Sequence, residues 1–518
     1  MSENRFDAIV IGAGHNGLTA AATLAAQGKS VCVLERDDRI GGMSKTADLD
    51  GAQVPEIAHL LYNLNPSVAK DLSLKLDTWA LPTVALSPDG NHVVINDGTA
   101  AFADGRVHPD AQAFATLYER LKKFAGLLGQ LADGPPPALS GGVLDPTTLG
   151  ELAKLGKLGW GLKRLGKKDM REFLRVILSN AFDLILDEIS DGPLAGALTA
   201  DAVRGGYAGP RSPGTAFSLM YRLGNGGVVT LPMGGIGAVA ASFESAARDR
   251  GVDIRTGVQI ERIVIAHDRV QGILLTNGTT LHADAVLSSA GAMQTMQIAG
   301  VANFDVEAAR RMRNLRNKGT TAKVNLVLNA VPTFTGLNKE QSAARLLVAP
   351  SARDVERAFN PAKYGEMSPA PLIEAVIPTL TDSSLAPDGT HILSAVVSYA
   401  PYALEGGWTE KARAQLLENV IQTLERYAPG IGSLVSKSQV LTPVDIEKMT
   451  GAPGGHWHHA EMGIDQILTV RPANLVSRYA FGVGGLYLCG ASAHPGGDVM
   501  GAAGRNAAMQ VIKDGVLG

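Results

Sequence analysis

The sequence predicts an α/β protein, and three observations along the chain favour this fold class. An apolar run at residues 6–11 leads into Gly12, Gly14 and Gly17, and an alanine-rich segment without proline follows. A second apolar run, at residues 30–36, comes shortly after that segment. Near the other end of the chain the order strand, glycine-rich loop and helix recurs. Strand–helix–strand units form right-handed crossovers between parallel strands, so we expect a parallel sheet covered by helices.

Size and composition narrow the class of protein. With 518 residues and 54.0 kDa the chain is long enough for a large core, which we expect to form two connected domains. A net charge of −3 gives no reason to expect a nucleic-acid partner. We see no apolar stretch long enough to span a membrane and no signal peptide. Two distant cysteines, Cys32 and Cys489, fit a reducing compartment, so we expect a cytoplasmic protein without a redox-active cysteine pair.

The N-terminal glycines have the spacing of a dinucleotide-binding loop. In this pattern the first glycine makes a tight turn, the second lets the backbone approach a pyrophosphate, and the third lets the helix pack on the strand. We expect a strand at 6–11 and a helix at 15–27, whose N-terminal N–H groups face the phosphates. Glu35 lies 18 residues after Gly17, the spacing expected of a carboxylate that binds ribose hydroxyls. The first unit therefore predicts a dinucleotide site.

Two further glycine patterns favour FAD over NAD. The segment "ERDDRIGG" places Gly41 and Gly42 six and seven residues after Glu35, so a second backbone segment can lie against the diphosphate and flavin. The segment "LYLCGASAHPGGDVMGAAGRNAA" predicts a strand, a loop and a helix whose N–H groups face the flavin ring. The predicted FAD-binding residues are Gly12, Ala13, Gly14, Asn16, Gly17, Glu35, Arg36, Gly41, Gly42, Met43, Gly490, Ala491, Gly497, Asp498 and Met500.

The rest of the chain predicts a sheet wing and a second domain. We expect a helix at 235–249 and strands at 252–258, 260–266, 269–275, 280–282 and 284–289. Further elements are strands at 320–329 and 391–402 and an amphipathic helix at 409–428. The predicted FAD-binding domain comprises residues 1–66, 225–300 and 475–518. The predicted substrate-binding domain comprises residues 67–224 and 301–474, including a basic helical segment at about 147–200.

Seven segments, in chain order, resemble one protein family. They are "GAGHNGL", "ERDDRIGG", "PMGGIG", "ADAVLSSAG", "KVNLVL", "HHAEMGIDQ" and "GLYLCGASAHPGGDVMGAAGRNAA". Together they resemble the phytoene-dehydrogenase-like FAD oxidoreductases, in the branch of the pyridine-nucleotide-disulfide-oxidoreductase-domain proteins, within the amine-oxidase-like flavoprotein fold. The resemblance implies a Rossmann-like FAD-binding domain of the glutathione-reductase type with an inserted mixed-sheet and helical substrate domain. Where the family usually has a third glycine this sequence has Asp498, whose carboxylate lies either near the flavin and substrate or in solvent.

The resemblance also points to three pocket residues. Lys323 resembles the lysine that amine-oxidase-like flavoproteins hold near flavin N5 through a water molecule, and a strand lysine facing outward is the alternative. His459, in "GGHWHHAEM", matches a histidine of the family. His59 follows the family's strand that leads to the flavin edge, and is either a pocket residue or a buried structural histidine. Adjacent histidines on an extended segment point to opposite faces, so we expect no metal site there.

These observations predict an FAD-dependent dehydrogenase or desaturase that takes hydride from an apolar or unsaturated carbon to flavin N5. No acid–base or nucleophile constellation stands out, which suits chemistry carried by the cofactor. The alternatives are a flavin amine or amino-acid oxidase of the same fold and a non-enzymatic lipid- or protein-binding escort protein. We expect an apolar small-molecule substrate, whereas the electron acceptor (oxygen, a quinone or another carrier) and the oligomeric state stay open. The basic helical segment also suggests peripheral contact with a membrane.

Overall fold

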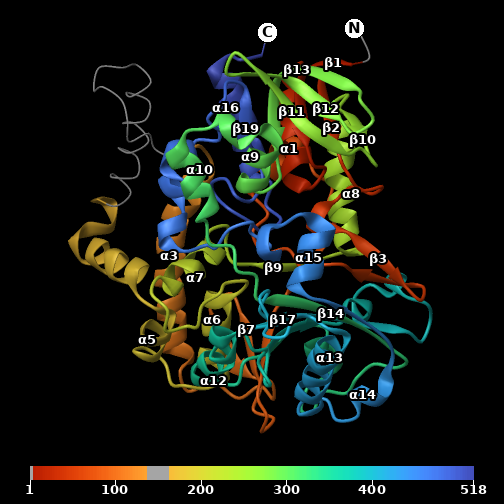
Figure 1. Ribbon diagram of the computed structural model, residues 1–518. Helices are drawn as coiled ribbons and strands as arrows, with labels where there is room; N and C mark the ends of the chain where they lie inside the picture. Colours follow the sequence, from red (N-terminus) through yellow and green to blue (C-terminus); the bar gives the residue numbers. More distant parts are fainter. Residues whose placement is uncertain (1–3, 137–162, 518) are drawn as a thin grey trace.

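The first of two large sheets carries the N-terminal unit. The structure is a computed structural model that describes residues 4–136 and 163–517. Within these residues the sheet has seven strands and lies at the top of Figure 1. In spatial order six of them are β10 (Asp253–Arg255), β2 (Val31–Leu34), β1 (Arg5–Ile11), β13 (Thr280–Ser288), β12 (Arg269–Leu275) and β11 (Ile260–Ala266). The seventh strand, β19 (Leu486–Leu488), also pairs with β13. Strands β11 and β12 form an antiparallel wing, and the other five run parallel.

The long strand β13 differs from the sequence prediction. Two strands were expected at 280–282 and 284–289, whereas the structure has one strand at Thr280–Ser288. Its first residues pair antiparallel with β12, and the same strand pairs parallel with β1 along most of its length. A single strand can serve both partners because its two edges carry separate rows of N–H and C=O groups. The wing is therefore a continuous extension of the parallel sheet.

Helix α1 (His15–Ala25) packs tightly on the parallel strands. Eight of its eleven residues are buried, because it lies between the sheet and two other helices, α8 (Gly235–Arg248) and α16 (Ala502–Asp514). A Cβ atom on Gly504 would lie 1.9 Å from the carbonyl oxygen of Asn16, so glycine lets α16 approach α1. The helix ends earlier than the predicted range of 15–27, and Gly28 follows with φ +78. The first strand–helix–strand unit is thus the one that the sequence predicts.

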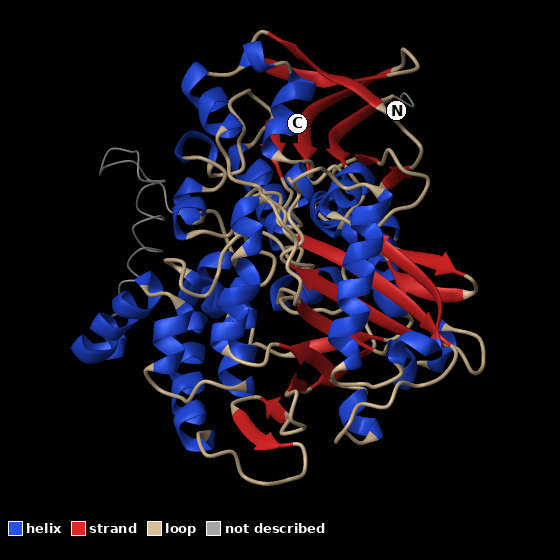
Figure 2. Cartoon of the chain, turned by 60° about the horizontal axis from the view of Figure 1, so that its bottom comes forward, coloured by secondary structure: helices blue, strands red, loops and turns tan. Residues whose placement is uncertain are grey.

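The second large sheet lies below the first in Figure 1, and Figure 2 shows it from another side. Its eight strands among the described residues are, in spatial order, β18 (Val435–Leu441), β14 (Thr321–Leu328), β17 (His391–Ser398), β16 (Leu372–Val376), β15 (Arg345–Val348), β6 (Thr83–Leu86), β7 (Val93–Asn96) and β8 (Thr99–Phe102). All neighbours pair antiparallel except β15 and β6. Strand β17 stops short of the predicted residue 402, because Tyr399 has a φ of 68.

Helices cover the second sheet and extend beside it. Helix α13 (Glu410–Glu425), predicted at 409–428, buries Leu416, Val420 and Leu424 in a core shared with β14 and β17. A separate core joins α3 (Ala111–Ala132), α5 (Ala181–Leu186), α6 (Pro193–Val203), α7 (Thr215–Leu223) and α12 (Ala352–Phe359). Helix α3 is a single helix of 22 residues. The other α-helices with labels are α2 (Pro66–Leu72), α9 (Ala292–Ala299), α10 (Val306–Arg313), α11 (Lys339–Ser342), α14 (Ile431–Leu434) and α15 (Pro443–Thr450).

Two short antiparallel pairs complete the strands of the described part of the chain. One joins β3 (Thr46–Leu49) to β4 (Ala52–Pro55), and the other joins β5 (Thr78–Leu81) to β9 (Val229–Pro232). Figure 1 shows both chain ends on the side of the first sheet. The strands of the first sheet come from both ends and from the middle of the sequence. The strands of the second sheet come from the two stretches that separate these parts. The exact domain boundaries stay a prediction.

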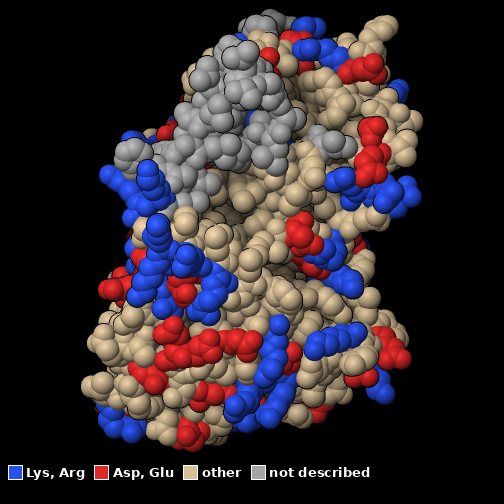
Figure 3. Space-filling model, turned by 90° about the vertical axis from the view of Figure 1, so that its left-hand side faces the viewer, with Lys and Arg blue, Asp and Glu red and all other residues tan. Residues whose placement is uncertain are grey.

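The basic helical segment is only partly inside the described residues. Residues 163–178 form a helix, and 147–162 lie outside the described part. Basic side chains gather on the face in Figure 3, and this helix exposes Met170, Leu174 and Leu178 at four-residue spacing. Within the described residues no helix combines the length and apolar character that a membrane span needs. Peripheral membrane contact stays a prediction, for which this apolar stripe beside basic residues is a candidate.

Candidate functional site: an elongated cavity at the carboxyl edge of the first sheet

An elongated cavity of about 410 Å³ begins where the parallel strands end. Ile11 and Gly12 end β1, Glu35 follows β2, and Ser289 follows β13, and all of them line the cavity. Ligands of open α/β sheets bind in the crevice outside the carboxyl ends of the strands. From there the cavity continues to a charged inner end at Arg204. The site therefore joins the first sheet to residues of the second part of the chain.

Two glycine turns meet backbone to backbone at the outer part of the cavity. Gly14 and Gly41 form an isolated parallel bridge, and the N–H of Gly41 donates to the carbonyl of Ala13 at 2.9 Å. A Cβ on Gly42 would lie 3.2 Å from the Cα of Gly14. Ala13, Gly17 and Gly41 support this turn and do not line the cavity, whereas Gly12, Gly14 and Gly42 do. The second glycine pair thus closes on the first, as the FAD prediction requires.

Glu35 is fixed by the main chain. One carboxylate oxygen accepts a hydrogen bond from the N–H of Ala13 at 2.7 Å, and the other accepts from the N–H of Asp37 at 3.1 Å. Each oxygen keeps a second lone pair, which a ribose hydroxyl in the cavity could use. Its neighbour Arg36 donates to the carbonyl oxygens of Lys448 and Met449, which tie the end of α15 over this part of the site. Glu35, Arg36 and Met43 all line the cavity.

The start of α1 has the features of a phosphate site. Its N-cap is Gly14, no side chain caps it, and its first turn carries no acidic residue. The first N–H groups of a helix lack helical partners and attract anions. His15 and Asn16 line the cavity there. Both ring nitrogens of His15 and the side-chain oxygen of Asn16 are buried and have no hydrogen-bond partner among the residues that the structure describes. Burial lowers the pKa of His15 to about 4, so the ring is neutral at pH 7. A dinucleotide with many polar groups fits these open positions.

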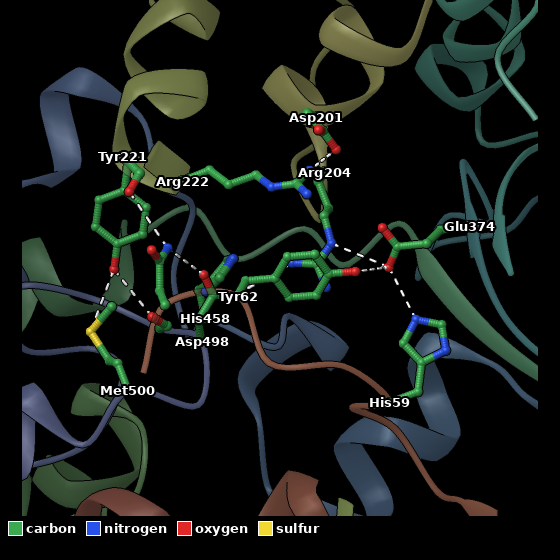
Figure 4. Close-up of polar contacts among 12 residues, drawn as sticks. His59, Tyr62, Asp201, Arg204, Tyr221, Arg222, Glu374, His458, Asp498 and Met500 are labelled. Atoms are coloured by element: carbon green, nitrogen blue, oxygen red, sulfur yellow. Dashed lines mark hydrogen bonds and ion pairs between the residues drawn. The ribbon is translucent and has the colours of Figure 1, made fainter. Parts of the chain in front are cut away.

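The inner end is built around the buried carboxylate of Glu374 on β16 (Figure 4). One of its oxygens accepts from Tyr62 Oη at 2.5 Å and from His59 Nε2 at 3.0 Å. The other accepts from Arg345 Nη2 at 2.5 Å and from Arg345 Nε at 2.8 Å. Burial would raise the pKa of Glu374, but Arg345 and Arg204 outweigh it and hold that pKa well below the usual value. The carboxylate is therefore ionised, and each of its oxygens accepts two hydrogen bonds.

Arg204 lies between two aromatic rings at this inner end. Its guanidinium carbon is 3.7 Å from the centre of the Tyr62 ring and 4.9 Å from the Trp457 ring. It also faces two carboxylates, with Nε 3.5 Å from Glu374 and Nη1 3.4 Å from Asp498. Cation–π attraction and ion pairing together hold the guanidinium in this position. Both rings and Arg204 line the cavity.

The structure places His59 in the cavity wall and Lys323 behind it. Burial and the charge of Lys323 lower the pKa of His59 to about 4, so its neutral ring donates from Nε2 to Glu374 and accepts at Nδ1 from Ser394, 3.2 Å away. Lys323 pairs in register with Val396, which lines the cavity, but Lys323 itself does not. Its Nζ is buried, and no described residue is its hydrogen-bond partner. The outward-facing alternative is thus wrong, while contact with flavin N5 stays a prediction.

Two histidines of the segment "GGHWHHAEM" line the cavity. His458 is buried and His459 is partly buried, and in each the ring Nδ1 is buried without a hydrogen-bond partner among the described residues. Burial lowers the pKa of His459 to about 3 and that of His458 to about 4, so both rings are neutral. His459 has a φ of 58, a backbone conformation that most residues avoid. The structure thus brings the predicted His459 to the cavity, next to a histidine that the sequence prediction left out.

The C-terminal glycine-rich segment contributes fewer wall residues than predicted. Ala491 and Asp498 line the cavity. Gly490 packs against the end of β13, since its Cβ would lie 2.2 Å from the Ser289 carbonyl oxygen, and a Cβ on Gly497 would lie 2.0 Å from the His458 ring. Met500 lines a separate small cavity. These three residues do not line the cofactor cavity, and their contact with the cofactor stays a prediction.

Asp498 lines the cavity with a side chain that is only 13% exposed, so the solvent alternative is wrong. It pairs with Arg204, and its second oxygen accepts from Asn63 Nδ2 at 3.1 Å. Burial raises its pKa, but His458, Arg204 and Asn63 outweigh that effect and lower the pKa below the usual value. Its φ of 73 is the conformation in which the family's glycine would be unstrained. The carboxylate therefore lies at the site and not in solvent.

Sequence reasoning missed most of the charged inner end. Tyr62, Arg204, Arg345 and Glu374 come from four separate parts of the chain. A signal was nevertheless present, because Glu374 and Arg345 are single charges inside apolar strands. Such residues are seldom buried unless they are paired.

Comparison with known proteins gives the family. The model of the family described as flavin containing amine oxidoreductase matches residues 17–512. The chain belongs to this flavin-containing amine oxidoreductase family. FAD is its cofactor, which confirms the prediction. The cavity residues fit FAD: the α1 N-terminus and the glycine turns would hold its diphosphate and Glu35 its ribose, and these contacts stay a prediction. The α/β fold class and an FAD-dependent oxidoreductase function are confirmed as well.

The proteins similar to this flavin-containing oxidoreductase include a desaturase and an amine oxidase. It is 32% identical to pyridine nucleotide-disulfide oxidoreductase domain-containing protein 2 of Rattus norvegicus, over 98% of this chain and 94% of that protein. It is 24% identical to phytoene desaturase (neurosporene-forming) of Rhodobacter capsulatus, over 95% of this chain and 91% of that protein. Cyclohexylamine oxidase from Brevibacterium oxydans shares the fold, with a TM-score of 0.59, 15% identity, and 98% and 99% of the two chains covered. The resemblance to the phytoene-dehydrogenase-like flavoproteins is confirmed.

Proposed function

We propose that this flavoprotein is a dehydrogenase of the desaturase type, which removes hydride from a carbon of a largely apolar skeleton. The observation that carries the proposal is the position of Arg204 between Tyr62 and Trp457. A pair of aromatic rings would suit the amine of an amine-oxidase substrate, but here the Arg204 guanidinium contacts both rings. A second cation between the same rings would be repelled. This favours a substrate without an amine over the amine-oxidase alternative.

The chain's own groups orient the substrate and exclude water. FAD supplies the hydride acceptor when it is bound. Ile57, Leu60 and Val396 give the inner part of the cavity apolar walls. His59 and Tyr62 are locked by Glu374, and their pKa values, about 4 and about 12, leave both neutral near pH 7. Neutral, fixed side chains suit a reaction in which the protein positions a C–H bond and transfers few protons.

Anaerobic bleaching of the bound flavin tests the proposal. The holoenzyme is mixed without oxygen with a panel of apolar alkenes, cyclic ketones and primary amines, and the visible absorbance of FAD is followed. We expect bleaching by members of the alkene or ketone groups and none by the amines. Bleaching by amines alone would reject the desaturase assignment. Protein that is purified without flavin absorbance would instead support the non-enzymatic alternative.

A further inference from the structure

A second cavity of about 390 Å³, here called the outer chamber, adjoins the cofactor cavity. The end of α6 and the residues after it, helix α7, and residues of the segment 456–465 form most of its walls. Arg204, His458 and Asp498 (Figure 4) line both cavities and so form the partition between them. The cavity residues that would hold the diphosphate and ribose of FAD line only the cofactor cavity. The outer chamber can therefore take a further ligand beside the cofactor.

The charged side chains of the outer chamber pair with one another. Three arginines and four carboxylates line it, namely Arg204, Arg222, Arg316, Asp201, Glu461, Asp465 and Asp498. The pairs are Arg222 with Asp201, Arg204 with Asp498, and Arg316 with both Glu461 and Asp465. An ion that entered the chamber would lose its hydration and find each of these charges already paired with its opposite. The charges therefore favour a ligand without a net charge.

His456 supplies a hydrogen-bond donor without a partner in the wall of the chamber. The residue is 1% exposed and lines the chamber. Its Nδ1 accepts from the main-chain N–H of His458 at 3.2 Å, and burial holds the pKa of the ring well below the usual value. The neutral ring therefore carries its proton on Nε2, which is buried and has no acceptor among the described residues. A ligand that supplies an acceptor oxygen would satisfy this donor.

Glu461 supplies an acceptor without a partner in the same chamber. Its Oε2 accepts from Arg316 Nε at 3.1 Å, whereas Oε1 is buried and has no partner among the residues that the structure describes. Burial raises the pKa of this carboxyl group, against the effect of Arg316. A carboxylate ligand can only accept hydrogen bonds and an ammonium group can only donate them, whereas a hydroxyl group does both. A hydroxyl group therefore suits a wall that offers both a donor and an acceptor.

We propose that the outer chamber binds a hydroxyl group of the substrate, with His456 Nε2 as the donor to its oxygen. The apolar skeleton extends from there past the partition toward the inner end of the cofactor cavity. This inference rests on the proposed function for the chemistry at the flavin. It adds the class of substrate, which is an uncharged apolar skeleton with a hydroxyl group. His456 is then a residue that selects the substrate and takes no part in hydride transfer.

Binding of matched eight-carbon probes to the holoenzyme tests this inference. Calorimetric titration compares octanol, octanoate and octylamine, and the absorbance of FAD reports that each variant keeps its cofactor. We expect octanol to bind more tightly than both charged probes. His456→Asn keeps an acceptor near the position of Nδ1 but removes the Nε2 donor, so it should weaken octanol binding roughly fivefold. His456→Gln places an amide N–H near the position of Nε2, so it should recover part of that affinity.

A second variant, Ser218→Phe, tests the position of the ligand independently of His456. Ser218 lies on α7 and lines the outer chamber but not the cofactor cavity. A phenyl ring there should fill the chamber and lower octanol affinity roughly tenfold or more, while FAD is retained. Ser245→Phe is the matched control, because Ser245 is exposed on α8 and lies outside both cavities, and it should change nothing.

Octanoate or octylamine binding as tightly as octanol would overturn the inference, and so would an unchanged octanol Kd in His456→Asn or in Ser218→Phe. The absence of saturable octanol binding would also overturn it, since water alone would then meet the open atoms of the chamber. Because binding is measured without turnover, His456-dependent octanol binding would stand even if no alkene or ketone bleached the flavin. Bleaching by such compounds without octanol binding would instead leave the proposed function and reject the hydroxyl site.

Discussion

At the scale of single residues, Lys323 is the most unusual group of the site. A buried amine without a partner is costly, and burial lowers its pKa far below the usual value. Glu374, which pulls that pKa upward, is itself held by Arg345, Tyr62 and His59. A residue that costs stability and makes no bond of its own is typical of a functional site.

Replacing this lysine should separate stability from activity. Lys323→Met nearly keeps the length of the side chain and removes the buried amine, so we expect an unchanged or higher Tm. We also expect the reduction of FAD by a substrate from the bleaching panel to slow at least tenfold, in stopped-flow measurements without oxygen. Lys437→Met, on the neighbouring strand β18 but exposed, is the matched control. A normal rate with a higher Tm would show that Lys323 has no part in the reaction.

At the scale of elements, the start of α1 is the part of the cofactor site that the sequence encodes most directly. The glycine turn, the uncapped helix and Glu35 lie within a short stretch, so local patterns predict them. The three glycines nevertheless differ in what a side chain would meet. A Cβ on Gly12 or Gly17 would lie 2.4 Å or 2.0 Å from neighbouring atoms, whereas on Gly14 the nearest neighbour is Gly42 Cα at 3.8 Å. Gly14 is thus the position where a side chain blocks the cofactor without disrupting the fold.

Gly14→Val should therefore give a folded protein without FAD. Its φ of −75 and ψ of 168 are open to valine, whose side chain would fill the space that faces the phosphates. Visible absorbance per protein should fall to near zero, while far-ultraviolet circular dichroism stays close to that of the parent apoprotein. Gly192→Val is the control, because Gly192 is also an uncapped helix N-cap with extended backbone and open space around it. Full FAD content in Gly14→Val would mean that the phosphates lie elsewhere.

Element boundaries show where local patterns lose their accuracy. Helix α13 and strand β14 were predicted within a few residues of their ends. The two predicted strands at 280–282 and 284–289 proved to be one strand, because β13 takes partners from two parts of the sheet. Periodicity reports which side of a segment is buried, and it contains no information about which strand will pair with it.

At the scale of the whole molecule, burial of neutral histidines links stability to pH. Burial, together with nearby charges, lowers the pKa of His15, His59, His458 and His494 to about 4 and that of His459 to about 3. The unfolded chain takes up protons near pH 6.5, where the folded protein does not. Their contribution to stability is therefore complete above about pH 6.5 and is lost as the pH falls toward 4. Glu374 and Asp498 have lowered pKa values, so their ion pairs also stabilise the folded protein less as the pH falls further.

The free energy of unfolding should thus fall steeply on mild acidification. Each buried histidine contributes a slope of about 1.4 kcal/mol per pH unit below its unfolded pKa. Urea unfolding in constant excess FAD at about pH 7.5, 6.5 and 5.5 measures the effect. We expect a loss of about 2 kcal/mol between the first two values and a further loss of several kcal/mol by the third. The exposed His267 provides a control, since His267→Gln should keep the same profile, and a flat profile in the parent protein would contradict the expectation.

The sequence by itself determined the cofactor and the outline of the fold, because both depend on contiguous patterns. Glycines that set a turn, a strand before them and a helix after them lie next to one another in the chain. Only the tertiary structure decided what stands at the far end of the cofactor cavity. Glu374, Arg204 and Tyr62 meet there from three separate segments. Such contacts depend on how distant elements pack, which no local pattern in the chain records.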